Sequence, residues 1–93
     1  MRITCDPGKR AGTLQERGLD FLDAATVFAG KTLTLEDDRF DYGETRYQTY
    51  GLLGERVVMV VWTPRGDARH IISMRHCHDK ETRKVRERLD GSR

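Results

Sequence analysis

The stretch Val57-Val58-Met59-Val60-Val61-Trp62 decides the fold of this chain, because all six of its residues are apolar. A strand with one face in water alternates apolar and polar residues, whereas a continuous apolar run indicates a strand buried on both faces. Turn residues lie on either side of the run, at residues 53–55 and 64–67. We therefore expect residues 57–63 to form the central strand of a β-sheet.

Three other segments have the composition of strands, since they are rich in β-branched and aromatic residues. They are residues 32–35, 45–50 and 68–74. The four strands are separated by turn segments at residues 37–43, 53–55 and 64–67, and connections this short favour antiparallel neighbours. The sequence therefore predicts a four-stranded antiparallel β-meander over residues 32–74.

Two helices are predicted before the meander, after a short strand at residues 1–5. Asp6 and Pro7 begin the first helix, because the carboxylate accepts from free backbone N–H groups and proline suits the first helical position. Gly18 ends this helix in a left-handed conformation. Asp20 begins the second helix and Gly30 closes it, and its apolar stripe comprises Phe21, Leu22, Ala24, Ala25, Val27 and Phe28.

A third helix is predicted after the meander, at residues 79–89. Its apolar residues are Val85 and Leu89, which lie four positions apart and therefore on one side. We expect this helix to pack lightly on the sheet. The predicted order is strand, two helices, antiparallel β-meander and C-terminal helix, which is an α+β fold.

The size and composition are those of one small domain over residues 1–93, with a modest core. The chain is 37% hydrophobic and 34% charged. No run approaches the ~20 apolar residues that cross a bilayer, and the N-terminus does not have the pattern of a signal peptide. We therefore expect a cytoplasmic protein without membrane contact, in which Cys5 and Cys77 are free thiols.

The distribution of charge is more informative than the net charge of +2. Residues 64–93 hold nine basic and five acidic side chains, and residues 1–63 hold eight basic and ten acidic ones. A basic C-terminal third beside an acidic remainder suits a protein that attracts a polyanion to one surface. For residues 80–88 alone, a solvated helix face is the better explanation of the charges.

Residues 65–78 hold most of the side chains that suit chemistry on a phosphate. All three histidines of the chain lie there (His70, His76 and His78), together with Arg65, Arg69 and Arg75. Arginine holds two phosphate oxygens in a fixed geometry, and histidine transfers protons near neutral pH. The combination predicts chemistry on a phosphodiester.

Strand periodicity divides these residues between two faces of the sheet. Alternation places Arg69, Ser73 and Arg75 on one face and His70 on the other. We therefore expect an ordinary strand to separate His70 from Arg75. His76 and His78 follow the strand, and we expect their side chains to project toward the same opening of the candidate site. His76-Cys77-His78 superficially suggests zinc, but adjacent ligands without a second spaced pair match structural zinc sites poorly, so we expect no metal site and no cofactor.

Over roughly residues 4–88, the chain resembles the BrnT family of bacterial toxins, which are ribonucleases paired with BrnA-type antitoxins and built on a RelE-like fold. The matching elements, in chain order, are Asp6-Pro7, the stretch from Lys9 through Glu16-Arg17-Gly18 to Phe28, Glu44-Thr45-Arg46 followed by Gly51, Arg65-Gly66-Asp67, and Ile71-Ile72-Ser73-Met74-Arg75. Three positions depart from the family pattern. Glu16-Arg17 replaces Lys-His, His70 replaces an arginine, and His76-Cys77-His78 follows Arg75.

The resemblance implies a RelE-like fold and a ribonuclease toxin that cleaves RNA without a metal. The resemblance and the chemistry of the side chains together give Arg46, Arg75, His70 and His76 as the expected catalytic residues. The expected RNA-binding residues are Lys9, Arg17, Arg69 and His78. The implied partner is a BrnA-type, ribbon-helix-helix antitoxin that covers Arg46, Arg69 and Arg75, with DNA reached only through the antitoxin. Two alternatives stay open. One is a weak or inactive toxin homologue that binds the antitoxin and tunes its autorepression, and the other is an RNA-binding module without cleavage.

Overall fold

The computed structural model describes residues 2–91. Its elements, in chain order, are β1 (Arg2–Cys5), α1 (Pro7–Arg17), a 3₁₀ turn η1 (Phe21–Asp23), α2 (Ala24–Ala29), β2 (Thr32–Glu36), β3 (Tyr47–Leu53), β4 (Arg56–Arg65), β5 (Ala68–His76) and α3 (Asp79–Asp90). The fold is therefore α+β, as the sequence predicts.

The five strands form one sheet in the order β1-β5-β4-β3-β2. β2 to β5 make the predicted antiparallel meander, and the apolar strand β4 is central. The sequence indicated no partner for the N-terminal strand. β1 pairs with β5 in parallel, with Thr4 opposite His70, so the sheet is mixed.

The helix ends follow the predicted capping residues. Asp6 accepts from the backbone N–H of Lys9, and Gly18 has the left-handed φ of 67°. Asp20 accepts from the N–H of Leu22, but it begins a 3₁₀ turn rather than a continuous second helix. The predicted order is therefore matched in part, because α2 keeps only six residues as α-helix.

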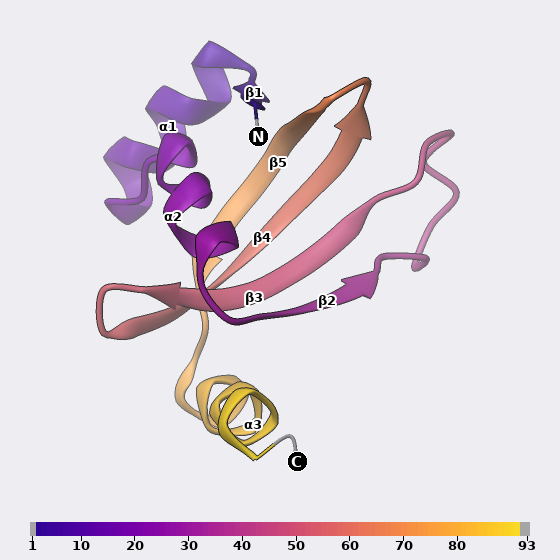
Figure 1. The fold of residues 1–93 in the computed structure, drawn as a ribbon. Helices are drawn as coiled ribbons and strands as arrows, with labels where there is room; N and C mark the ends of the chain where they lie inside the picture. Colours follow the sequence, from indigo (N-terminus) through magenta and orange to yellow (C-terminus); the bar gives the residue numbers. More distant parts are fainter. Residues whose placement is uncertain (1, 92–93) are drawn as a thin grey trace.

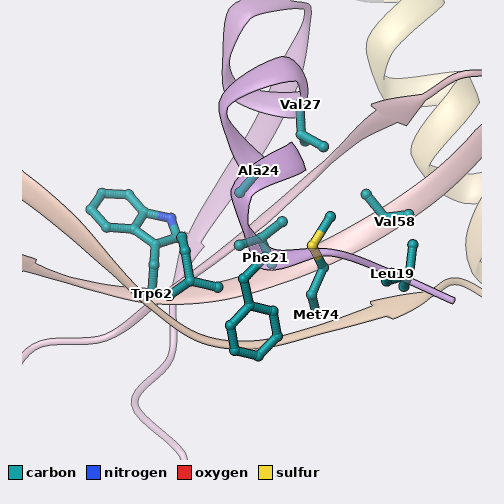
Figure 2. Close-up of a cluster of buried hydrophobic side chains, with 9 residues drawn as sticks. Leu19, Phe21, Ala24, Val27, Val58, Trp62 and Met74 are labelled. Atoms are coloured by element: carbon teal, nitrogen blue, oxygen red, sulfur yellow. The ribbon is translucent and has the colours of Figure 1, made fainter. Parts of the chain in front are cut away.

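Helices lie on both sides of the sheet (Figure 1), and each face has a hydrophobic core. On one face, α1, η1 and α2 cover a cluster that includes Phe21, Val27, Trp62, Ile71 and Met74 (Figure 2). On the other face, α3 packs a smaller cluster of Val57, Met59, Val61, Cys77 and Val85. The light packing predicted for the last helix is confirmed, since Val85 is its only buried residue.

A β-bulge in β5 changes which side chains share a face. Val61 pairs with Ser73 and Trp62 pairs with Ile71, so Ile72 is an extra residue in β5. Ile71 and Met74 consequently both lie in the core under the helices, three residues apart, while Ile72 packs in the α3 cluster. The strict alternation expected from the sequence is wrong beyond this point.

Cys5 and Cys77 are free, as predicted. Burial raises the pKa of the Cys77 thiol to about 11, so the thiol is protonated at neutral pH. Within residues 2–91, no helix is both long enough and apolar enough to cross a membrane.

Candidate functional site

A row of polar side chains crosses the sheet on the face that carries α3, near the turn between β4 and β5. Thr4 pairs with His70, and His70 pairs with Thr63, so the three side chains lie on one face. Arg46 precedes Tyr47, the partner of Trp62, and therefore lies beside Thr63. The Thr63 hydroxyl donates to the carbonyl oxygen of Thr45 at 2.6 Å, which joins the start of β3 to this row.

His70 is held within the row. Its Nδ1 lies 2.9 Å from the Thr4 hydroxyl, and the side chain is partly buried. Desolvation, followed by the nearby positive charge of Arg65, lowers the pKa of His70 below its ordinary value. The imidazole is therefore neutral at pH 7 and can accept a proton. The positive charge of Lys9 also contributes to the lowered pKa.

Two guanidinium groups meet one carboxylate beside His70. The Nε of Arg46 lies 3.2 Å from Glu44 Oε2, and the Nη2 of Arg65 lies 3.6 Å from Glu44 Oε1. The guanidinium of Arg46 also stacks over the Tyr42 ring, 4.0 Å from its centroid. The side chain of Arg46 is 26% exposed and that of Arg65 is 56% exposed, so both cations reach solvent at this end of the face.

Arg75 lies on the same face as His70, farther along β5. It pairs with Met59, and both Met59 and Val61 belong to the α3 cluster. A strand rises about 3.3 Å per residue, so the Cα atoms of His70 and Arg75 are about 15 Å apart. This separation suits contacts with different phosphates of one nucleic-acid strand. The expectation that His70 and Arg75 face apart is wrong, because the bulge at Ile72 reverses the alternation.

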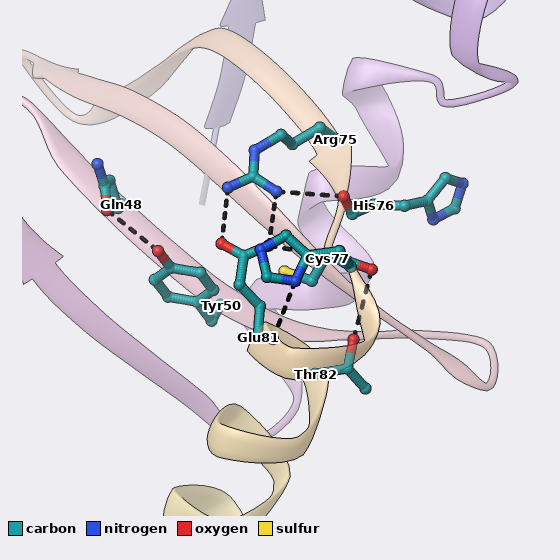
Figure 3. A network of polar contacts seen from close by, with 8 residues as sticks. Gln48, Tyr50, Arg75, His76, Cys77, Glu81 and Thr82 are labelled. Carbon is teal, nitrogen blue, oxygen red and sulfur yellow. Dashed lines mark hydrogen bonds and ion pairs between the residues drawn. The ribbon is translucent and has the colours of Figure 1, made fainter.

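The guanidinium of Arg75 is engaged by Glu81, from the first turn of α3 (Figure 3). Nη1 and Nη2 each donate to one carboxylate oxygen of Glu81 at 2.8 Å. The hydrogen bonds from Arg75 lower the pKa of Glu81 to about 2. Glu81 also accepts from the backbone N–H of His78, whose Nδ1 accepts from the N–H of Glu81. The ion pair therefore joins β5 to the cap of α3.

Three of the residues selected from the sequence lie away from this face. Arg69 is on the opposite face, where its guanidinium stacks on Phe28 and Trp62 at 4.4 and 4.5 Å from the ring centroids. His76 points away from Arg75 (Figure 3), and its buried Nδ1 has no hydrogen-bond partner. Arg17 donates to the carbonyl oxygen of Met74 at 2.9 Å.

The basic surface expected from Arg46, Arg69 and Arg75 is therefore not formed, because Arg69 is on the helix-covered face. The expectation that His76 and His78 project toward the same opening of the candidate site is also wrong. His76 pairs with Val58, a residue of the core under the helices, whereas His78 caps α3. Of the expected RNA-binding residues, Lys9 is the one whose charge contributes to the lowered pKa of His70.

The site also includes residues that sequence reasoning did not select. Arg65 was noted for its charge, and its Arg-Gly-Asp turn was the signal that it lies near the end of the central strand. Glu44 was expected only as an ion-pair partner. Nothing in the local sequence identified Thr4, because its role depends on the parallel pairing of β1 with β5.

No three or more His, Cys, Asp or Glu side chains between residues 2 and 91 come together in a group that could hold a metal ion. The side chains on this face offer a neutral imidazole and the guanidinium groups of Arg46, Arg65 and Arg75. These side chains can accept a proton and stabilise negative charge on a phosphate.

Comparison with known protein families gives a match to this chain. The family described as "Ribonuclease toxin, BrnT, of type II toxin-antitoxin system" matches residues 5–81, which contain the polar row except for Thr4, together with the Arg75–Glu81 pair. No curated protein matches the chain.

Proposed function

The chain belongs to the BrnT family of ribonuclease toxins of type II toxin–antitoxin systems, and we propose that this member cleaves RNA without a metal ion, on the sheet face that carries His70. One observation carries the proposal. The bulge in β5 places the neutral imidazole of His70 on the same face as the cations Arg46, Arg65 and Arg75.

His70 is the general base in this mechanism. Metal-free cleavage begins when a base removes the proton of the ribose 2′-OH, so that the 2′-oxygen can attack the adjacent phosphorus. His70 suits this step because its lowered pKa keeps the imidazole unprotonated at neutral pH. In the tautomer whose Nδ1–H donates to the Thr4 hydroxyl, 2.9 Å away, the lone pair of Nε2 is free to accept the proton.

Arg46 and Arg65 stabilise the charge that develops on the phosphorane. A guanidinium fork donates to two phosphate oxygens at once, and such donors are worth most where charge grows in the transition state. The bond between phosphorus and the 5′-oxygen then breaks, and Lys9 supplies the proton for the leaving oxygen. The products are a 2′,3′-cyclic phosphate and a 5′-hydroxyl end.

Arg75 binds a neighbouring phosphate of the same RNA strand. Its distance of about 15 Å along β5 from His70 excludes a shared phosphate oxygen but suits an RNA strand that follows the sheet face. Glu81 uses one side of the guanidinium, through Nη1 and Nη2, and leaves the Nε–H for a phosphate.

The family implies an antitoxin partner, and we propose that it is a BrnA-type ribbon-helix-helix protein that covers the face with Arg46, Arg65 and Arg75. An acidic segment would complement these cations and occlude the RNA path. DNA would then be contacted only through the antitoxin. Substituting Arg65 by glutamate should slow antitoxin association, and an unchanged association rate would place the antitoxin elsewhere.

A second candidate function is supported by the ion pairs on this face. Arg46 and Arg65 approach Glu44, and Arg75 is held by Glu81, so three of the cations have carboxylate partners. Glu16-Arg17 also stands where the family has Lys-His. A chain whose cations are neutralised in this way would bind the antitoxin and tune its autorepression without cleaving RNA.

Cleavage of RNA by the purified chain, free of antitoxin and in the presence of EDTA, tests the proposal. The expected products carry 2′,3′-cyclic phosphates, which mass spectrometry identifies. Activity that disappears in EDTA and returns with a divalent metal contradicts the metal-free mechanism. No cleavage at all, with tight antitoxin binding, supports the second candidate.

A further inference from the structure

Asp37 is the only charged residue between residues 2 and 91 that is buried. Its side chain is 1% exposed, and it directly follows the end of β2. A buried carboxylate is costly unless several donors satisfy it. The contacts of Asp37 therefore indicate what it contributes to the fold.

Those contacts organise the loop that connects β2 to β3. Arg39 donates from Nε to Oδ1 and from Nη2 to Oδ2, both at 2.8 Å. The hydroxyl of Tyr42 donates to Oδ2 at 3.4 Å. The hydrogen bonds from Arg39 lower the pKa of Asp37 to about 2, so the carboxylate stays ionised at neutral pH and has no part in proton transfer.

The same residue connects to Arg46 by two routes. The backbone N–H of Asp37 donates to the carbonyl oxygen of Arg46 at 2.8 Å. The side-chain route runs through Tyr42, because the ring that Asp37 holds by its hydroxyl lies under the Arg46 guanidinium, at 4.0 Å from its centroid. The guanidinium is further restrained by Glu44 at 3.2 Å.

We propose that Asp37 is a positioning residue for RNA cleavage, which acts by holding the Tyr42 ring under Arg46 so that the guanidinium faces the scissile phosphate. The inference rests on the proposed function, since it assigns Arg46 to the phosphorane. It goes beyond that function because Asp37 does not contact RNA. A misplacement of the guanidinium by about 1 Å is enough to slow cleavage strongly.

The alternative role is a purely structural anchor for the loop. A structural anchor would lower stability, and its effect on cleavage would add to that of any other substitution. A positioning residue acts only through Arg46, so its effect should vanish when Arg46 is absent. The two roles therefore differ in a double-mutant cycle.

The experiment compares Asp37→Asn, Arg46→Ala and the double variant, with Asp38→Asn as the matched control. Asp38 is the adjacent, exposed aspartate, so its substitution makes the same charge change. Single-turnover cleavage of a 5′-labelled RNA oligonucleotide gives the rate, and RNA titration separates the rate from affinity. Circular dichroism and thermal unfolding check that each variant is folded.

We expect Arg46→Ala to lose about a hundredfold in the single-turnover rate and Asp37→Asn to lose on the order of tenfold, with RNA affinity nearly unchanged. The double variant should be no slower than Arg46→Ala. Losses that multiply, or an Asp37→Asn variant as active as Asp38→Asn, overturn the proposal. If Asp37→Asn does not fold, Tyr42→Leu replaces it in the cycle, because that variant removes the ring and leaves Asp37 paired with Arg39.

A second measurement separates failure of this inference from failure of the proposed function. The ring current of Tyr42 should shift the guanidinium NMR resonances of Arg46, and Asp37→Asn should remove the shift while Asp38→Asn keeps it. This result does not depend on cleavage. A wild-type chain that shows the shift but does not cleave RNA contradicts the function alone, whereas a shift that survives in Asp37→Asn contradicts the positioning role.

Discussion

His70 and Arg75 face the same side of β5, although five positions along a regular strand would place them on opposite sides. The extra residue Ile72 restores their common direction. Strict alternation would make Arg75 the more important of the two for cleavage. The observed geometry favours His70, because the charges of Arg65 and Lys9 act on His70 whereas the guanidinium of Arg75 is engaged by Glu81.

Replacing His70 by alanine should reduce the rate of RNA cleavage by a hundredfold or more, because general base catalysis typically contributes about 10²–10⁴-fold. His76→Ala is the matched control, since that imidazole belongs to the same strand but lies on the opposite face. We expect the control to cleave at nearly the wild-type rate. Equal losses in two folded variants would show that the imidazole of His70 has no special role.

The pH dependence of kcat/KM should show the titration of His70. The unprotonated imidazole is the active form, so the rate should rise with pH and reach a plateau at neutral pH. Because burial and Arg65 lower the pKa of His70, the midpoint should lie below 6.5. Measuring the profile in His70→Ala provides the control, since this step in the curve should disappear. A midpoint well above 6.5 contradicts the assignment of His70 as the base.

Replacing Glu81 by glutamine should strengthen RNA binding, because it removes the carboxylate that competes with phosphate for Arg75. The amide keeps a similar shape and can still accept from the N–H of His78. Filter binding at several salt concentrations measures the effect, and the salt dependence should steepen by about one phosphate contact. Glu87→Gln, an exposed change on the same helix, is the control. Weaker binding by Glu81→Gln would mean that Glu81 positions Arg75 for RNA rather than competing with it.

Replacing Arg69 by alanine should lower the free energy of unfolding and leave cleavage intact. Its guanidinium stacks on Phe28 and Trp62, and contacts of this kind contribute about 0.5–2 kcal/mol. Urea unfolding measures the first effect, and the RNA assay measures the second. A folded Arg69→Ala variant without activity would extend the site to the opposite face of the sheet.

Much of the fold was predictable from the sequence, because local signals determined it. Asp6, Gly18 and Asp20 cap the predicted helix ends, and the apolar run at residues 57–62 lies in the central strand. These features depend on a few adjacent residues. The family resemblance selected Arg46 and side-chain chemistry selected His70, and these two residues lie together on the polar face.

The remaining features depend on contacts between distant segments. No glycine or proline in the sequence indicates the bulge at Ile72. The bulge reverses the alternation of β5, so side chains on its two sides no longer follow one regular pattern of faces. The placement of Arg69, His70 and Arg75 was predicted wrongly for this reason. The parallel partner of β1 was likewise absent from the prediction, because nothing in residues 2–5 identifies β5.

The pairing of β1 with β5 has a consequence for when the proposed centre can form during synthesis. Thr4 and His70 are 66 residues apart in the chain, so the hydrogen bond that orients the imidazole forms only after β5 has left the ribosome and joined β1. A nascent chain that ends before β5 does not contain this centre. Pairing between such distant segments is also slow, because the chain between them must first close into a loop. Under the proposed function, an antitoxin would therefore have time to meet the chain before the centre forms.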